Sequence, residues 1–425
     1  MEEETNNQLP PITPAKDLPA VPSFLKSRKW MEADVSKDFL DFEEDYRPPR
    51  YTLERNGVPF ANVGELHVIS GKPGHGKTGL MSQLMAAVLY GEFGNTKARE
   101  TKRKQIDPDN LDEYLKDDNG NVVEMAVKPR VLYIDTEQGK DDTIAIKNRV
   151  CTLAGIDYKK PSQSFYILRL RDTETAEERW KKVLKAVLVV KPTDIFLDGM
   201  LDIVKDYNDQ VECQPIIRES MMLATHYDTS LWMVLHENPL VEKLVGTLGS
   251  IVQRKVAEIF TVQKIKQNDL KPNDRRPDLP EIYFRVKQVK ARGRDVSDWL
   301  FEYIQNAGGW GMPMEIDENG RVGDPDAAKR AKEKKDIDEI FKQYPWTSLG
   351  ASYTELEDWL RNKKHVRGHK VSKLFSDGQE YGIIYKTTTS KRPKYFYNGL
   401  YNDIPNDAPE DIPFEENKTE EQAPF

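Results

Sequence analysis

Short apolar runs alternate with longer segments of helical periodicity through the middle of this 425-residue chain. The runs have the length of buried strands, and the segments between them repeat apolar residues at helical spacing. Strands are expected at 66–70, 131–135, 165–169, 194–198 and 231–235, and helices near 78–92, 142–154, 175–190 and 211–227. Continuous apolar strands that alternate with helices indicate a mostly parallel sheet with both faces covered, so the predicted fold class is α/β.

Three more strand-like segments follow, at 258–266, 282–290 and 299–304. We expect them to be antiparallel strands that extend the sheet. Between the first helix and the second strand, residues 95–130 form a highly charged stretch with a turn signal at Asp117–Asn121. A charged segment of this kind indicates a surface insertion.

A small separate unit is expected near the C-terminus. Residues 328–344, 354–361 and 371–375 have helical patterns, and two apolar strand-like pieces follow at 383–386 and 394–397. Three helices followed by a hairpin are typical of a winged helix-turn-helix.

The predicted organisation therefore has five parts. Composition separates the ends from the folded parts, since the first residues are rich in Pro, Glu and Asn. The parts are a disordered segment over 1–25, the α/β domain over 26–312, a linker over 313–327, the winged-helix domain over 328–400 and a disordered acidic tail over 401–425.

Charge is segregated along the chain, and its net value of −8 conceals this. Residues 361–395 contain ten Lys or Arg and two acids, a net charge of +8, while residues 402–425 contain eight acids and one lysine, a net charge of −7. A basic unit directly before an acidic tail says more about partners than the total does.

Several features favour a cytoplasmic location. Cys151 and Cys213 match no metal spacing, which favours a reducing compartment. No apolar run approaches the ~18–20 residues that span a bilayer, so we expect no membrane association. The first residues, Met1–Glu4, lack the basic start and apolar core of a signal peptide.

The segment Gly71–Thr78 reads Gly-Lys-Pro-Gly-His-Gly-Lys-Thr, a complete G-x-x-x-x-G-K-[ST] phosphate-binding loop between an expected strand and an expected helix. Glycines there allow backbone N–H groups to face a phosphate, and the helix N-terminus adds partial positive charge. Lys77 would reach the β- and γ-phosphates, and Thr78 would bind Mg²⁺. The predicted cofactors are therefore ATP and Mg²⁺. The predicted nucleotide-binding residues are Gly71, Lys72, Pro73, Gly74, His75, Gly76, Lys77, Thr78 and Gly79.

Polar residues end three of the following strands, and their order resembles that of the RecA-like ATPases, most closely the RepA-type and DnaB-type hexameric helicases, over roughly residues 55–310. The resemblance implies that Glu137 polarises the attacking water, although an acidic helix cap is the alternative. Asp198 ends an apolar strand and would hold Mg²⁺ with Thr78. His236 is the candidate γ-phosphate sensor, and a structural histidine is the alternative.

The segment Lys290-Ala-Arg292 matches the K-x-R pattern of hexameric helicases. The resemblance implies that Arg292, assisted by Lys290, reaches the γ-phosphate bound to a neighbouring subunit of a homo-oligomer, most simply a hexamer. A guanidinium suits this role because it stays charged and binds phosphate bidentately. Arg294 and Lys287 leave the register open.

The same resemblance places single-stranded DNA contacts in the loops 200–213 and 238–250. These loops are not strongly basic, because Lys205 and Lys243 are outnumbered by nearby acids. Val245 stands where the family pattern has an arginine, so no contact is transferred to it.

Partners are also suggested by the C-terminal parts. The basic residues of the winged-helix unit fit nucleic-acid phosphates, with protein docking as the alternative. The segment Glu410–Phe414 resembles the terminal peptide of bacterial single-stranded-DNA-binding proteins, which favours replication proteins as partners, although a solubilising tail explains it equally.

These observations predict an ATP-hydrolysing motor on single-stranded DNA, a replicative-type hexameric helicase of a bacterial, plasmid or mobile element. One alternative is a non-translocating RecA-like ATPase that loads or regulates another DNA factor. Another is a P-loop kinase or metabolic ATPase that does not act on DNA.

Overall fold

The protein is described here by a computed structural model. It covers residues 48–107, 114–118, 120, 122–238, 244–305, 310–317, 319–323, 327–347, 350–366, 368–386 and 393–397. The predicted disordered segment 1–25 and the acidic tail 401–425 lie outside the described residues.

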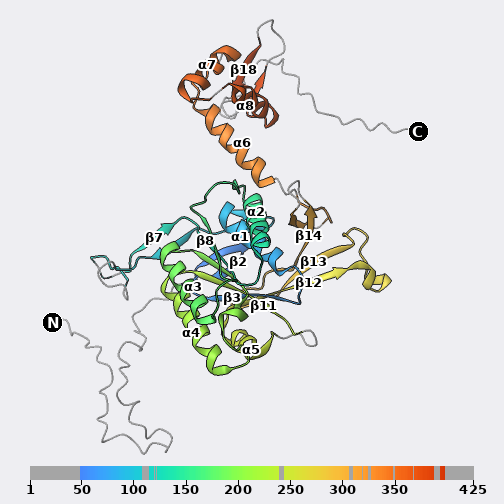
Figure 1. Ribbon diagram of the computed structural model, residues 1–425. Helices are drawn as coiled ribbons and strands as arrows, with labels where there is room; N and C mark the ends of the chain where they lie inside the picture. The colour runs from blue at the N-terminus through green and yellow to red at the C-terminus, as the bar shows by residue number, and fades with distance from the viewer. Residues whose placement is uncertain are drawn as a thin grey trace, which may run out of the picture. The chain divides into compact units, whose positions relative to one another are not determined.

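A nine-stranded sheet forms the centre of the large domain, in the order β15-β14-β13-β12-β3-β11-β10-β8-β9 (Figure 1). Neighbours from β9 to β12 run parallel. These six strands are β3 (Leu66–Gly71), β8 (Val131–Asp135), β9 (Phe165–Arg169), β10 (Asp194–Asp198), β11 (Ser230–His236) and β12 (Glu258–Lys266). The predicted α/β class with a mostly parallel sheet is confirmed.

The remaining strands, β13 (Ile282–Lys290), β14 (Trp299–Gln305) and β15 (Gly311–Ile316), extend the sheet antiparallel to one another. The expectation of antiparallel strands is corrected in one respect, because β12 pairs parallel with β3 and only its other edge is antiparallel. The sheet continues through Ile316, so the predicted linker 313–327 begins inside its last strand.

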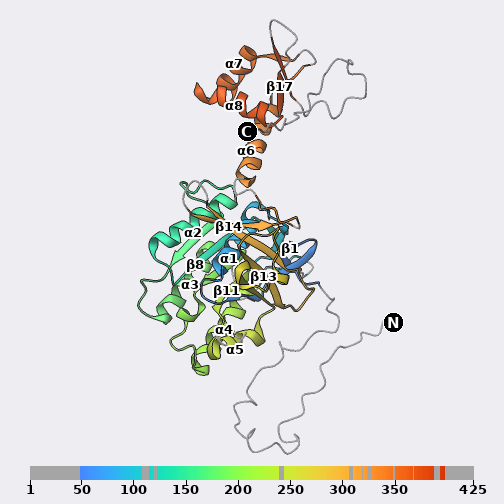
Figure 2. The same ribbon diagram turned by 90° about the vertical axis from the view of Figure 1, so that its right-hand side faces the viewer.

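Helices cover both faces of the sheet (Figures 1 and 2). Their apolar residues fall into two separate clusters on the two faces, as the strand alternation requires. One face holds α1 (Lys77–Tyr90) and α2 (Lys140–Leu153), and the other holds α3 (Ala176–Val190), α4 (Gln210–His226) and α5 (Gly246–Lys255).

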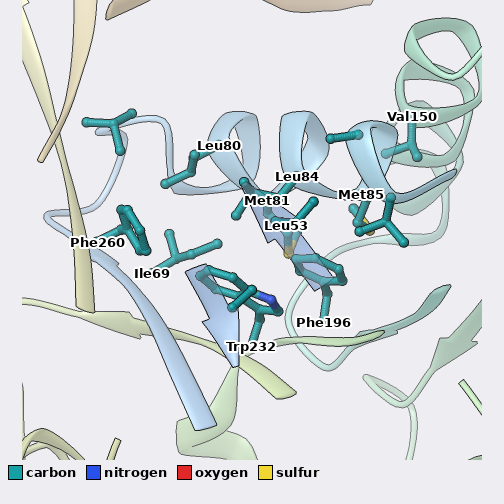
Figure 3. Close-up of a cluster of buried hydrophobic side chains, with 14 of the residues drawn as sticks. Leu53, Ile69, Leu80, Met81, Leu84, Met85, Val150, Phe196, Trp232 and Phe260 are labelled. Carbon is teal, nitrogen blue, oxygen red and sulfur yellow. The ribbon is translucent and has the colours of Figure 1, made fainter. Parts of the chain in front are cut away.

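The core beneath α1 fixes the helix that follows the phosphate loop. Leu80, Met81 and Leu84 of α1 are almost completely buried against Ile69 of β3 and Trp232 of β11 (Figure 3). Burying each such side chain contributes on the order of 1.5–3 kcal/mol. The start of α1 is therefore held rigidly over the strands that carry the candidate site residues.

Short strands surround the central sheet. They are β1 (Tyr51–Arg55), β2 (Val58–Asn62), β4 (Glu92–Phe93) and β5 (Thr96–Ala98) in one small sheet, and β6 (Thr101–Lys104) with β7 (Glu124–Val127) in the insertion. The insertion is tied to the domain by Arg103, whose guanidinium donates to the carbonyls of Lys191 and Pro192. No helix in the described part of the chain is long and apolar enough to cross a membrane.

The C-terminal unit contains three helices and a three-stranded sheet of order β16-β18-β17. Phe341, Leu356, Val371 and Phe375 form the centre of its own apolar core. Its elements are α6 (Ala327–Lys342), β16 (Ala351–Ser352), α7 (Tyr353–Lys363), α8 (His369–Glu380), β17 (Ile384–Lys386) and β18 (Lys394–Tyr397). The elements match those expected from the sequence, and the winged-helix assignment stays a prediction.

Asp194, at the start of β10, is completely buried, and this burial raises its pKa to about 6. A folded-state pKa above the unfolded value of about 3.9 means that folding favours the protonated form. The carboxyl group therefore lowers the free energy of unfolding as the pH rises from about 4 to 6, by roughly 3 kcal/mol in total.

We expect Asp194→Asn to remove this loss of stability. The variant should gain stability over the natural protein progressively between pH 4 and pH 6 and keep the gain above pH 6, as measured by urea unfolding. Asp274→Asn, on the exposed surface, is the control and should show no such trend. A stability difference that is independent of pH would show that burial does not shift the titration of Asp194.

Candidate nucleotide-binding site

The phosphate-binding loop connects the end of β3 to the start of α1, as predicted. Gly76, directly before the helix, has φ +85°, a conformation that favours glycine. A Cβ atom there would also lie 2.6 Å from the Phe284 ring, which is too close for any side chain. The loop is thus closed against β13, and its backbone remains free to face a ligand.

Lys77 folds back over this loop. Its Nζ donates hydrogen bonds to the carbonyl oxygens of Gly71 at 3.0 Å and Lys72 at 3.1 Å, and lies 3.1 Å from Nδ1 of His236. Burial lowers the pKa of Lys77, while the carboxylates of Asp198 and Glu137 oppose this shift. The ammonium therefore lies at the mouth of the loop, within reach of a bound phosphate.

Three predicted residues meet Lys77 because their strands end at the same edge of the sheet. The register places Asp198 beside Asp135 and His236 beside Gly71. Oε1 of Glu137 lies 3.7 Å from Nε2 of His236. The imidazole lowers the pKa of Glu137, against the opposing effect of burial, so this carboxylate is ionised at neutral pH, as a base that accepts a proton must be.

Asp198 is buried at the tip of β10. Burial raises its pKa to about 7, the negative charges of Glu137 and Asp135 add to the shift, and Lys77 opposes it. A carboxyl group that is costly to ionise by itself is suited to a divalent cation, whose charge would restore the ionised form. Together with the hydroxyl of Thr78, Asp198 can hold Mg²⁺ beside a phosphate.

Asp135 takes the helix-capping role that the sequence left open for Glu137. Its Oδ1 accepts hydrogen bonds from the backbone N–H groups of Glu137 and Gln138, at 3.1 and 2.8 Å, and its Oδ2 accepts one from Thr143 in α2 at 2.6 Å. These bonds hold the turn before α2. The Glu137 side chain is thereby left to face the site.

Glu237, the residue after the candidate sensor, is a site feature that sequence reasoning missed. Its Oε1 accepts hydrogen bonds from Ser70 at 2.8 Å and Thr261 at 3.1 Å, and these two hydroxyls lie 2.7 Å apart. The three residues tie the tips of β11, β3 and β12 together. The only sequence signal was an acid directly after the end of a predicted strand.

Lys290 and Arg292 lie away from the chain's own phosphate loop. Arg292 donates to Oε1 of Glu65 at 3.0 Å and to the carbonyl of Lys255 at 2.7 Å, and Lys290 donates to the carbonyl of Gln253 at 2.7 Å. Glu65 precedes β3, whereas the phosphate loop follows it. At about 3.3 Å per residue, the strand separates the two ends by roughly 20 Å. Arg292 therefore does not reach the phosphate site of its own subunit.

Comparisons with known proteins give little beyond this geometry. No protein-family model matches the chain, and no curated protein matches it. Among solved structures, one neighbour is a KaiC-like protein from the archaeon Pyrococcus horikoshii, with 11% sequence identity, a TM-score of 0.39, and coverage of 63% of this chain and 99% of that chain. At this similarity the residues of the site, and not the neighbour, carry the proposal below.

Proposed function

We propose that this protein is a RecA-like ATPase that acts as a motor on single-stranded DNA, most specifically a replicative-type hexameric helicase. The observation that supports ATP hydrolysis best is the meeting of Lys77, Glu137 and Asp198 at one edge of a parallel sheet, beside a complete phosphate-binding loop. Ligands of open α/β sheets bind at this edge.

Each residue has a separate task in the proposed reaction. Lys77 neutralises charge on the β- and γ-phosphates, and the backbone of the loop holds them in line. Thr78 and Asp198 hold Mg²⁺, which supplies further charge compensation when bound. Glu137 orients and deprotonates the attacking water, and His236 keeps that carboxylate ionised and bridges it to Lys77.

A ring is proposed because the K-x-R segment cannot serve its own subunit. Arg292 is 45% exposed in its side chain and lies at the opposite edge of the sheet from the phosphate loop. In a closed ring with head-to-tail interfaces, one subunit's Arg292 can face the next subunit's phosphate loop. The proposed homo-oligomer, a hexamer, thus completes a site that is incomplete in one chain.

The C-terminal unit is proposed to bind nucleic-acid phosphates as a winged helix. In α8, the side chain of Lys373 is 72% exposed, and Lys370 is exposed as well. Lys386 is exposed at the end of β17, near the position of the wing. Exposed lysines of this kind give a salt-dependent affinity without base specificity.

Strand displacement tests this function against a loader or regulator. A forked duplex with a labelled strand should be unwound in the presence of ATP and Mg²⁺, and the Lys77→Ala variant should not unwind it. DNA-stimulated hydrolysis without strand displacement would instead favour the non-translocating ATPase. Hydrolysis that DNA does not affect would favour a kinase or metabolic ATPase.

A further inference from the structure

A groove beside the phosphate loop lies on the outer face of β12 and β13, which run side by side (Figure 1). It has a volume of about 470 Å³. We call it the basic groove, defined by its charged lining residues Lys72, Glu237, Lys264, Arg285, Lys287 and Lys290. It extends from the phosphate loop to the K-x-R segment.

Strand alternation explains why this face is open. Phe260 and Val262 of β12 point into the core under α1, with Phe284 and Val286 of β13. The residues between them point the other way, so that Gln263 is exposed opposite Arg285. Beyond α5 no helix in the described part of the chain buries this end of the strand pair, and Val289 is 53% exposed.

Five of the six charged lining residues are cations. The single carboxylate, Glu237, already accepts hydrogen bonds from Ser70 and Thr261. Arg285 is paired with Asp298, which lies outside the lining, at 2.6 Å. The structure gives Lys287 no carboxylate partner within the described residues. The groove therefore presents a strong positive potential suited to a polyanion.

The loops in which the sequence analysis placed DNA contacts have the opposite charge. In the described part of 200–213, Asp206 and Asp209 accept hydrogen bonds from backbone N–H groups and are exposed to solvent. Lys205 is the only basic residue there. A phosphate backbone would be repelled by this loop and attracted by the basic groove.

We propose that the basic groove binds the phosphate backbone of single-stranded DNA. The site deepens the proposed function and rests on it, because it places the strand beside the phosphate loop and between that loop and the K-x-R segment. Ile265 and Val289 offer apolar surface to the bases, and no aromatic residue lines the groove. Binding is therefore dominated by phosphate contacts and depends little on base sequence.

The test adds negative charge to the groove without removing an ion pair seen in the structure. A full-length Gln263→Glu, Lys287→Glu variant changes the charge by −3, and Lys185→Glu with Gln214→Glu makes the same change on exposed helix surfaces. Binding of a labelled oligo-dT strand is followed by fluorescence anisotropy at several salt concentrations. A third variant, Lys205→Glu, tests the acidic loop.

We expect the groove variant to bind oligo-dT at least about tenfold more weakly and to lower the salt dependence by about 0.7 for the lost lysine contact. The surface control and Lys205→Glu should stay within about twofold of the natural protein. Hydrolysis of ATP without DNA should be unchanged in the groove variant, which shows that the fold and the nucleotide site are intact.

Three other outcomes would overturn the inference. Equal weakening of the groove variant and the surface control would show an effect of net charge alone. Loss of binding only in Lys205→Glu would return the strand to the loop 200–213. If the natural protein itself fails to bind oligo-dT, the proposed function fails, and the groove inference fails with it.

Discussion

Glu137→Gln is expected to bind ATP with nearly natural affinity and to lose hydrolysis by a factor of about 10²–10⁴, the usual contribution of a positioned base. The amide fills the same space but cannot accept the proton of the attacking water. Lys77→Ala should fail one step earlier and lose nucleotide affinity, because the phosphate charge is left without its ammonium partner. The two variants thus separate binding from turnover.

Binding of a fluorescent ATP analogue and release of phosphate measure these two steps. Glu174→Gln, an exposed glutamate before α3, is the matched control and should keep both. Hydrolysis at the natural rate in Glu137→Gln would show that another group activates the water. Since Asp135 is fully engaged in capping α2, such a result would redirect attention to Glu237.

Arg292→Ala is expected to lower hydrolysis by about 10³–10⁵, the range that an arginine finger supplies in related phosphoryl transfers. Nucleotide affinity should hardly change, because Arg292 lies at the far edge of its own subunit's sheet. Its contacts with Glu65 and the Lys255 carbonyl are exposed, so removing them should cost little stability. Arg294→Ala resolves the register and should remain active.

Mixing Arg292→Ala with Lys77→Ala subunits tests action between neighbours. In a mixed ring, some sites combine an intact phosphate loop from one subunit with an intact Arg292 from the next, so part of the activity should return. The mass of the assembly shows whether mixed rings have formed. If mixed rings recover no hydrolysis, Arg292 does not act on a neighbouring subunit.

The central strands and the phosphate loop could be predicted from sequence because local pattern determines them. Each buried strand reads as a continuous apolar run, and its last residue marks the edge where ligands bind. Asp198 and His236 were therefore found from position alone, and the structure places both near Lys77. The start of β15 was assigned to the linker because Pro313 and the polar residues after it hide an edge strand.

Features that depend on pairing between distant segments could not be predicted. The link between Ser70, Glu237 and Thr261 requires the order of β11, β3 and β12 in the sheet, which single-sequence reasoning does not provide. The parallel pairing of β12 was missed for the same reason. The basic groove was also missed, because its cations come from three segments and no one segment is strongly basic by itself.

The central claim, an ATPase driven by single-stranded DNA, is tested most directly by measuring ATP hydrolysis of the purified protein with and without oligo-dT. The account predicts Mg²⁺-dependent hydrolysis that rises several-fold with oligo-dT and disappears in Lys77→Ala. Absence of hydrolysis, or a rate that is the same with and without oligo-dT, would contradict it.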